Sequence, residues 1–200
     1  MRRPFHHGNL RAVLLDQAEV MLRAGGVDGL SLRELARQAG VSHGAPRSHF
    51  IDRQALLDAL AVQGFERMAE KIGVALHVPA PVRERFRLVG RAYVDFAVDN
   101  AALMELMFAA KSNEVPGPVT DAAVRLFTLL DDGLVANSNA GAGGQHRERF
   151  KLLFAAAMQG TAALITSRRI TREQGEVLVD DAMDALLASQ LGTGILADER

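Results

Sequence analysis

Hydrophobic residues recur along this chain at the three- and four-residue spacing of amphipathic helices, and no segment shows the strict alternation of a strand. The first helix is expected over residues 9–23, before the glycine-rich sequence GGVDG. The second lies within residues 31–40, where Ser31 and Glu34 have the spacing of a capping box and Gly40 suits the end of the helix. The periodicity predicts an all-α protein.

A tight turn and a short third helix are expected in the next sequence, AGVSHGAPRSHF, residues 39–50. Ser42 is a candidate N-cap, and Pro46 in the first turn forfeits at most one intrahelical hydrogen bond. Proline also disfavours helical backbone at Ala45, which predicts an irregular first turn. The residues expected to face outward are His43, Gly44, Arg47 and Ser48, and those expected to face inward are Ala45 and Phe50.

The rest of the chain predicts longer helices. Asp52 is a candidate N-cap for a helix that runs to about Leu76. Proline- and glycine-rich breaks then leave helices near residues 81–99, 101–110, 119–136, 146–167 and 172–191. The last two helices are apolar on more than one face, which a helix with one side in water does not need. Burial against a second subunit is the economical interpretation, and it predicts a homodimer through residues 146–191.

Charge divides the chain at residue 53. Residues 1–53 carry eight arginines and five acidic residues, a net charge of +3, whereas the remainder carries fifteen basic and nineteen acidic residues, a net charge of −4. Four of the six histidines also lie in the first part. A small basic domain, 1–53, ahead of a larger acidic domain, 54–200, indicates that the first part meets a polyanion such as nucleic acid.

Composition places the chain among soluble globular proteins, with 48% hydrophobic and 24% charged residues. The sequence has no cysteine, which fits a reducing compartment and excludes disulfides and thiolate ligands. It also lacks the apolar region of a signal peptide and any run of about 18 apolar residues. We therefore expect a cytoplasmic protein with no membrane partner.

A short helix, a glycine turn and a third helix form a helix-turn-helix pattern, whose second helix enters the major groove of DNA. The sequence SLRELARQAGVSHGAPRSHFIDRQALLDAL, which spans this pattern, resembles the DNA-binding domain of the TetR (tetracycline repressor) family. The residues that match the family's pattern are Ser42, Gly44, Ala45, His49 and Phe50. The departures are His43, Pro46 and Arg47, where the family typically has Lys, Leu and Tyr.

The resemblance implies a helix-turn-helix domain, with its motif at about residues 31–50, and a larger helical regulatory domain, about nine helices in total. It implies a ligand-responsive transcriptional regulator, most often a repressor, that binds a palindromic operator on double-stranded DNA as a homodimer. A small-molecule inducer releases such a regulator from DNA. The resemblance also implies that the last two helices of each subunit form a four-helix dimer interface. No enzyme activity, cofactor or metal is expected.

The candidate DNA contacts are the polar and basic residues of the motif and its flanks: Ser31, Arg33, Ser42, His43, Gly44, Arg47, Ser48, His49 and Arg53. Arg47 is the main candidate, because a guanidinium can hold a phosphate or read guanine O6 and N7. Its structural alternative is an ion pair with Asp52.

A small hydrophobic or aromatic inducer needs apolar walls with a few polar groups. The candidate residues are Tyr93, Phe96, Met104, Met107, Phe108, Phe127, Met158 and Gln159. The same set also describes a helical core in which methionine fills gaps. The sequence alone leaves open whether a pocket is present.

Three further features suggest other chemistry. The sequence DDAMD places Asp180 and Asp184 on one helical face beside Asp181, a spacing that some prenyl-diphosphate enzymes use for magnesium, although a polar helix face explains it more simply. A phosphate loop follows a strand, but the glycine-rich sequence AGAGG, residues 140–144, does not. His6 and His7 are expected in an N-terminal arm that contacts DNA phosphates or is disordered. The alternative to a regulator is therefore an all-helical small-molecule-binding protein, or a prenyl-type enzyme that uses the three aspartates.

Overall fold

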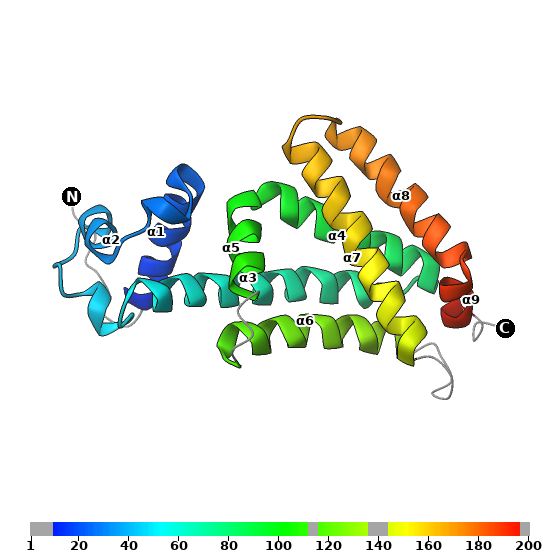
Figure 1. Cartoon of the computed structure of the whole chain (residues 1–200), viewed down its shortest axis with the longest axis horizontal. Coiled ribbons are helices and arrows are strands. Elements are labelled where there is room, and N and C mark those ends of the chain that lie inside the picture. Colours follow the sequence, from blue (N-terminus) through cyan, green and yellow to red (C-terminus); the bar gives the residue numbers. More distant parts are fainter. Residues whose placement is uncertain (1–9, 112–115, 136–143, 197–200) are drawn as a thin grey trace. The chain divides into compact units, whose positions relative to one another are not determined.

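The computed structural model describes residues 10–111, 116–135 and 144–196, and within these ranges the fold is helical throughout (Figure 1). The α-helices are α1 (Leu10–Gly25), α2 (Leu32–Ala39), α3 (Arg53–Leu76), α4 (Val82–Asp99), α5 (Ala101–Lys111), α6 (Pro118–Val135), α7 (Gly144–Thr166), α8 (Arg172–Ala188) and α9 (Gln190–Leu196). Two 3₁₀ turns, η1 (Val27–Gly29) and η2 (Pro46–Ser48), lie on either side of α2. None of the described helices combines the length and the hydrophobicity that a membrane span requires.

The helices form two compact units. Unit 1 contains Met1–Phe65 and Asn100–Ala123, and unit 2 contains Glu66–Asp99 and Val124–Arg200. Helices α3 and α6 each begin in unit 1 and end in unit 2. The described residues 10–60 of unit 1 are called the head below.

The core of the head forms where the apolar faces of α1, α2 and the start of α3 meet. Its fully buried side chains are Leu14, Ala18, Leu22, Leu35, Ala36, Leu56 and Leu60. Removing this apolar surface from water is the main stabilising contribution to the head. Arg23, near the end of α1, donates to the Glu19 carboxylate at 2.5 Å and to the Asn100 side chain at 3.2 Å. These hydrogen bonds tie α1 to the residue that precedes α5.

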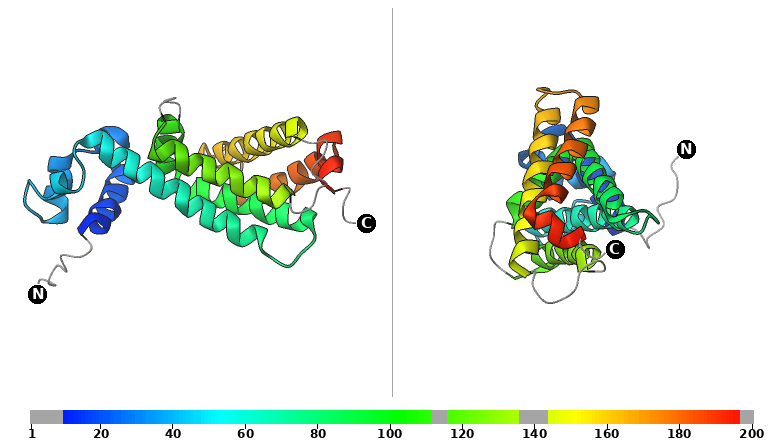
Figure 2. Two further views of the ribbon diagram at one scale, coloured as in Figure 1. Left: turned by 90° about the horizontal axis from the view of Figure 1, so that it is seen from below. Right: turned by 90° about the vertical axis from the view of Figure 1, so that its right-hand side faces the viewer.

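Unit 2 is built around the contact of α4 with α7 and α8. Helices α7 and α8 lie side by side as an antiparallel pair (Figures 1 and 2). The ring of Phe86 in α4 meets the ring of Phe150 in α7 edge to face, with their centroids 5.8 Å apart, which is a favoured aromatic geometry. A Cβ on Gly90 of α4 would lie 3.0 Å from both Met158 Sδ and Val179 Cγ1. Glycine at this position therefore allows α7 and α8 to approach α4 closely.

Most helix boundaries agree with the predicted ones, and α3 ends at Leu76 as expected. The single helix predicted over residues 172–191 is wrong, because the chain leaves the helical conformation at Ser189 (φ −69°, ψ 164°) and α9 follows. The Ser189 hydroxyl accepts the N–H of Gly192 at 3.2 Å. A Cβ on Gly192 would lie 2.3 Å from the carbonyl oxygen of Leu186. A serine cap and a glycine thus allow the chain to fold α9 back against α8.

Candidate nucleic-acid interface

Helix α2 begins after Ser31 and ends before Gly40, as predicted, and one of the two hydrogen bonds of the predicted capping box is present. The Ser31 hydroxyl accepts the N–H of Glu34 at 3.1 Å, and Gly40 follows the helix with a left-handed φ of 67°. The Glu34 carboxylate is held by the Arg37 guanidinium and the Gln38 amide. These hydrogen bonds, above all that from Arg37, lower the pKa of Glu34 to about 2. Arg37 is therefore engaged within α2.

Residues 42–50, called the recognition segment below, form a turn and one 3₁₀ turn rather than the expected third α-helix. The N–H groups of Ala45, Arg47 and His49 donate to the carbonyl oxygens three residues earlier, at 3.0, 3.1 and 3.0 Å. Pro46 has no N–H to donate, so it interrupts the four-residue ladder of an α-helix and favours this tighter pattern. Ala45 itself keeps helical backbone (φ −59°, ψ −42°), contrary to expectation. The hydrogen bond from the Ala45 N–H to the carbonyl oxygen of Ser42, at 3.0 Å, and the burial of Pro46 hold Ala45 in the turn against this preference.

The recognition segment has the predicted outward and inward faces. The exposed residues are Ser42, His43, Gly44, Arg47, Ser48 and His49. Pro46 and Phe50 are buried, and Ala45 is half-buried. The guanidinium of Arg11 in α1 lies over the Phe50 ring, 5.4 Å from its centroid, in a cation–π contact. The inward side chains therefore anchor the segment to the head and leave its polar groups free to meet a ligand.

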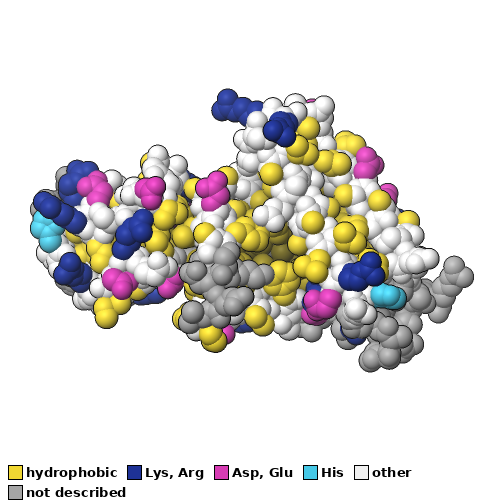
Figure 3. Space-filling view, in the orientation of Figure 1, with side chains coloured by type: hydrophobic (Ala, Val, Ile, Leu, Met, Phe, Trp, Pro, Cys, Tyr) yellow, Lys and Arg dark blue, Asp and Glu magenta, His cyan; other side chains and the backbone are white. Residues whose placement is uncertain are grey.

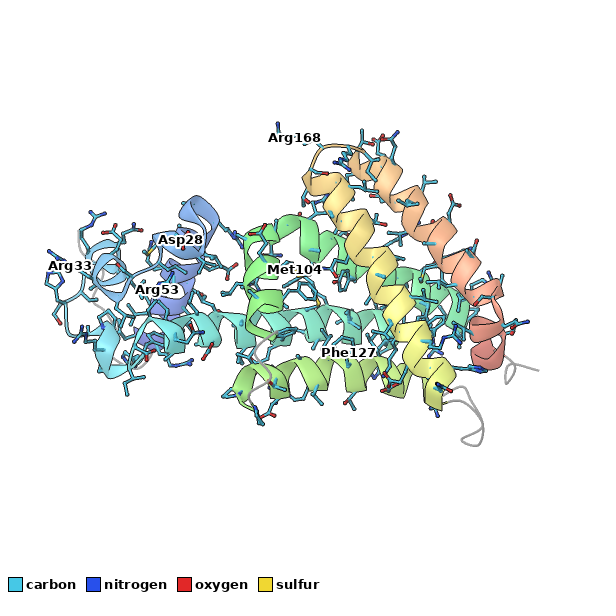
Figure 4. The ribbon with its side chains drawn as sticks, in the orientation of Figure 1. Asp28, Arg33, Arg53, Met104, Phe127 and Arg168 are labelled. Atoms are coloured by element: carbon cyan, nitrogen blue, oxygen red, sulfur yellow. The ribbon has the colours of Figure 1, made fainter. Side chains whose placement is uncertain are left out.

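Two arginines of the head are available to an anion. Arg33 in α2 and Arg47 in the recognition segment are exposed, and neither has a hydrogen-bond or ion-pair partner among the described residues. Within the described head, the Asp52 carboxylate caps α3 by accepting the N–H of Ala55 at 2.8 Å, rather than pairing with Arg47. Basic side chains and a histidine lie among acidic ones on the visible face of the head (Figure 3), and Arg33 belongs to α2 (Figure 4). Free guanidinium groups on an exposed face suit DNA phosphates and guanine edges.

Arg53, the first residue of α3, has partners that the sequence did not indicate. Its Nε donates to the carbonyl oxygen of Leu30 at 2.8 Å, and one terminal nitrogen donates to the carbonyl oxygen of Val27 at 2.6 Å. Both acceptors lie in the loop ahead of α2. The guanidinium of Arg53 therefore joins two elements of the head.

The remaining predicted DNA-binding residues have simpler surroundings. Ser31 caps α2 and is exposed, and Ser42 is exposed in the turn after it. The Ser48 hydroxyl donates to the carbonyl oxygen of Ala45 at 2.7 Å. His6 and His7, expected in an N-terminal arm, and most of the sequence AGAGG lie outside the described residues.

The predicted inducer residues are divided between the two units. Those of unit 2 are Tyr93, Phe96 and Met158, which are buried, Phe127, which is half-buried, and Gln159, which is exposed. Those of unit 1 are Met104 and Met107, which are buried, and Phe108, which is half-buried. The Tyr93 ring meets Phe154 edge to face with centroids 6.5 Å apart, and burial raises the pKa of Tyr93 to about 12. Met104 projects from α5 and Phe127 from α6 (Figure 4).

A cavity of about 150 Å³ lies between α4, α7 and α8 of unit 2. Its lining residues are Arg91, Val94, Asp95, Val98, Ile165, Arg172, Glu176 and Val179, and none of them belongs to the predicted inducer set. Arg172 at its rim donates to Asp95 at 3.2 Å and to Asp99 at 2.5 Å. The cavity is smaller than the ~300 to 1,000 Å³ of most ligand pockets.

Two of the three aspartates of DDAMD, Asp180 and Asp184, form ion pairs with arginines of α4. The Asp184 carboxylate accepts from Arg83 at 2.8 Å and from Arg87 at 2.7 Å, and Asp180 is bound by the fork of Arg91. The hydrogen bond from Arg87, followed by that from Arg83, lowers the pKa of Asp184. Among the described residues, no group of three His, Cys, Asp or Glu side chains is placed to hold a metal. The sequence DDAMD therefore joins α8 to α4 in this structure.

Helices α7 and α8 each carry a buried and an exposed apolar face, as predicted. The buried side chains include Phe150, Phe154, Met158, Val179 and Met183. The exposed ones include Leu152, Leu153, Ala156, Ala163, Val177 and Leu178. The inward faces form the core of unit 2. The outward faces form a second apolar surface that the described residues of one chain leave open to solvent.

Two family models match this chain. The model described as bacterial regulatory proteins of the tetR family matches residues 14–60, and the model described as a tetracyclin repressor-like C-terminal domain matches residues 86–190. No curated protein matches the sequence.

Solved structures share the fold over nearly the whole chain. A protein of unknown function from Rhodococcus sp. RHA1 is 37% identical, with a TM-score of 0.76, and the match covers 92% of this chain and 97% of that one. A bacterial regulatory protein in the tetR family from Rhodococcus RHA1 is 18% identical, with a TM-score of 0.69 and coverage of 88% and 96%. The fatty acid degradation regulator of Bacillus halodurans is 15% identical, with a TM-score of 0.70 and coverage of 93% and 98%. The last two likenesses concern the fold alone.

Proposed function

The chain belongs to the TetR family of bacterial transcriptional regulators, and from this premise we propose that it is a homodimeric repressor that a small molecule releases from DNA. Residues 1–53 would bind DNA in the cytoplasm, and residues 54–200 would bind the inducer and the second subunit. The observation that carries the proposal is that Arg33 and Arg47 are exposed on a helix-turn-helix head and have no hydrogen-bond or ion-pair partner in the part of the chain that the structure describes. Such groups bind the phosphates and base edges of double-stranded DNA.

Contacts within the recognition segment support different roles for its side chains. Arg47 is exposed in the same segment as the exposed His43 and His49, so we assign it the main DNA contact and favour a phosphate as its partner. Ser42, Gly44 and Ser48 offer small exposed groups and backbone that can approach DNA closely. Arg33 on α2 and the Ser31 end of the same helix complete the proposed surface.

The proposed homodimer uses the outward faces of α7 and α8, within residues 146–191. Leu152 and Val177 remain 65% and 61% exposed in one chain, although both belong to helices whose other face is fully packed. Exposed apolar patches of this kind mark protein interfaces. Two-fold pairing of the helices would present two heads to the two halves of a palindromic operator, about one DNA turn or a multiple of it apart.

The inducer is proposed to be a small hydrophobic or aromatic molecule that binds in the regulatory domain near Tyr93 and Phe96. Both side chains are buried in α4, and Tyr93 carries a hydroxyl on an otherwise apolar stripe. An inducer releases DNA only if it binds the non-binding form of the dimer more tightly than the DNA-binding form.

The experiment that tests the proposal is a mobility-shift titration of the full-length protein on the DNA upstream of its own gene. Binding to a palindromic site, with weak binding to unrelated duplex of equal length and salt, is expected. Equal affinity for both duplexes across a salt series would refute the regulator assignment.

A further inference from the structure

We propose that Arg53 positions the recognition segment for DNA instead of contacting DNA itself, an inference that rests on the proposed function. Arg53 is the first residue of α3 and follows the recognition segment directly. Its two hydrogen bonds reach carbonyl oxygens 23 and 26 residues earlier in the sequence, at Leu30 and Val27. The residue thus connects the helix after the recognition segment with the loop before α2.

The loop that Arg53 holds is itself well fixed. Gly26 begins it with a left-handed φ of 65°, and the N–H of Leu30 donates to the carbonyl oxygen of Val27 at 3.1 Å. The Leu30 side chain is buried, and Ser31 after it caps α2. Arg53 therefore sets the start of α3 relative to the start of α2, the helix that leads into the recognition segment.

The recognition segment needs such support, because only a few hydrogen bonds within it fix its backbone. One 3₁₀ turn is too short to be stable by itself, since helix nucleation is unfavourable. Its orientation must come from what holds its two ends. Helix α2 holds the first end through the turn at Gly40, and the buried Phe50 together with Arg53 holds the second.

The edge of the Arg53 guanidinium that carries Nε is already occupied within the head. Bidentate recognition of a phosphate uses two parallel N–H groups of the guanidinium fork. In Arg53, Nε and one terminal nitrogen already donate to neutral carbonyl oxygens. Turning this fork towards DNA would break both hydrogen bonds and free the loop ahead of α2. Arg33 has no such partners among the described residues, so it is the matched arginine for comparison.

The test compares Arg53→Ala, Arg53→Lys and Arg33→Ala by titrating operator and unrelated duplex over a salt series. Both Arg53 variants should lose about tenfold or more in operator affinity, because hydrogen bonds to a charged group are lost and lysine cannot span two carbonyls. Their affinity for unrelated duplex and their salt slope should not change. Arg33→Ala should instead weaken both duplexes and reduce the slope by about 0.9 for each lost phosphate contact.

The proposal is overturned if Arg53→Lys binds the operator like the unmodified protein while Arg53→Ala loses salt slope, because a phosphate contact behaves in that way. It also fails if neither variant changes operator affinity. Binding to unrelated duplex shows that the head of each variant is folded.

If the Arg53 variants do not fold, a measurement on the unmodified protein still tests the proposal. The NMR signal of the Arg53 Nε–H should be protected from solvent exchange and should stay in place when operator is added, whereas a large shift contradicts the proposal. If the unmodified protein does not select any operator, the proposed function fails, whatever the state of Arg53.

Discussion

Replacing Leu152 by alanine should weaken the proposed dimer without unfolding the protomer. Leu152 lies on the outward face of α7 and is 65% exposed in one chain. Its loss therefore removes little from the core of unit 2, and surface substitutions of this kind change stability by about 0.5 kcal/mol or less. The effect on association should be much larger, because the proposed interface would bury this side chain.

The magnitude follows from the exposed fraction. Replacing leucine by alanine removes three carbons, and burial of each carbon contributes ~0.8 kcal/mol. Because 65% of the side chain is exposed in one chain, an interface that covers it would gain about 1.6 kcal/mol from these carbons. In the proposed two-fold dimer the side chain would be lost from both subunits, which would cost about 3 kcal/mol. The dissociation constant should rise on the order of a hundredfold.

Sedimentation velocity over a concentration series measures this dissociation constant directly. Val74→Ala is the matched control, because Val74 on α3 is 69% exposed but lies outside α7 and α8. That variant should dimerise like the unmodified protein. If Leu152→Ala and Val74→Ala have the same dimer affinity, or if the unmodified protein is a monomer that binds operator tightly, the interface is misplaced.

Three other changes test the remaining assignments. Arg47→Ala should weaken all DNA sequences alike and lower the salt slope by about 0.9 per subunit in mobility-shift titrations, and an unchanged slope would exclude a phosphate contact. Burial raises the pKa of Tyr93 to about 12, and because Tyr93 is the only tyrosine in the chain, phenolate absorbance should show half-ionisation about two units higher in the folded protein than in denaturant. The fold favours the neutral phenol of Tyr93, which adds to the free energy of unfolding below pH 10. This added stability is lost as the pH rises from 10 to 12, and the loss should be absent in Tyr93→Phe. Ala97→Trp, a buried change on α4 beside Phe96, should mimic or block the inducer, and an unaltered response to inducer would place the site elsewhere.

The helices could be predicted because their signal is local. The apolar spacing in residues 81–99 indicates which side of that helix turns inward, and Phe86, Val89 and Phe96 are buried accordingly. Local signals also placed the caps at Ser31 and Asp52. The break at Ser189 was missed, because it depends on how closely α9 returns to α8.

Two parts of the site could not be predicted from spacing. The sequence around Pro46 permits both an α-helical turn and a 3₁₀ turn, which differ by few hydrogen bonds, so packing of Pro46 and Phe50 decides between them. The partners of Arg53 and of Asp184 lie far away along the chain. Periodicity shows that a helix has a polar face, but it does not show which other element that face meets.

The recognition segment is short, and several contacts with the rest of the head hold it in place. An α-helix of several turns orients its side chains through its own ladder of hydrogen bonds, whereas one 3₁₀ turn must be oriented by its surroundings. Pro46 reduces the freedom of the segment by fixing its own φ, and Phe50 under Arg11 fixes the end. A segment held in this way loses little conformational entropy when it binds, because its backbone is ordered beforehand. In the proposed complex few side chains would face the DNA, so sequence selection would depend on the exposed neighbours of Arg47, while Arg47 and the charge on α2 would supply affinity that all sequences share.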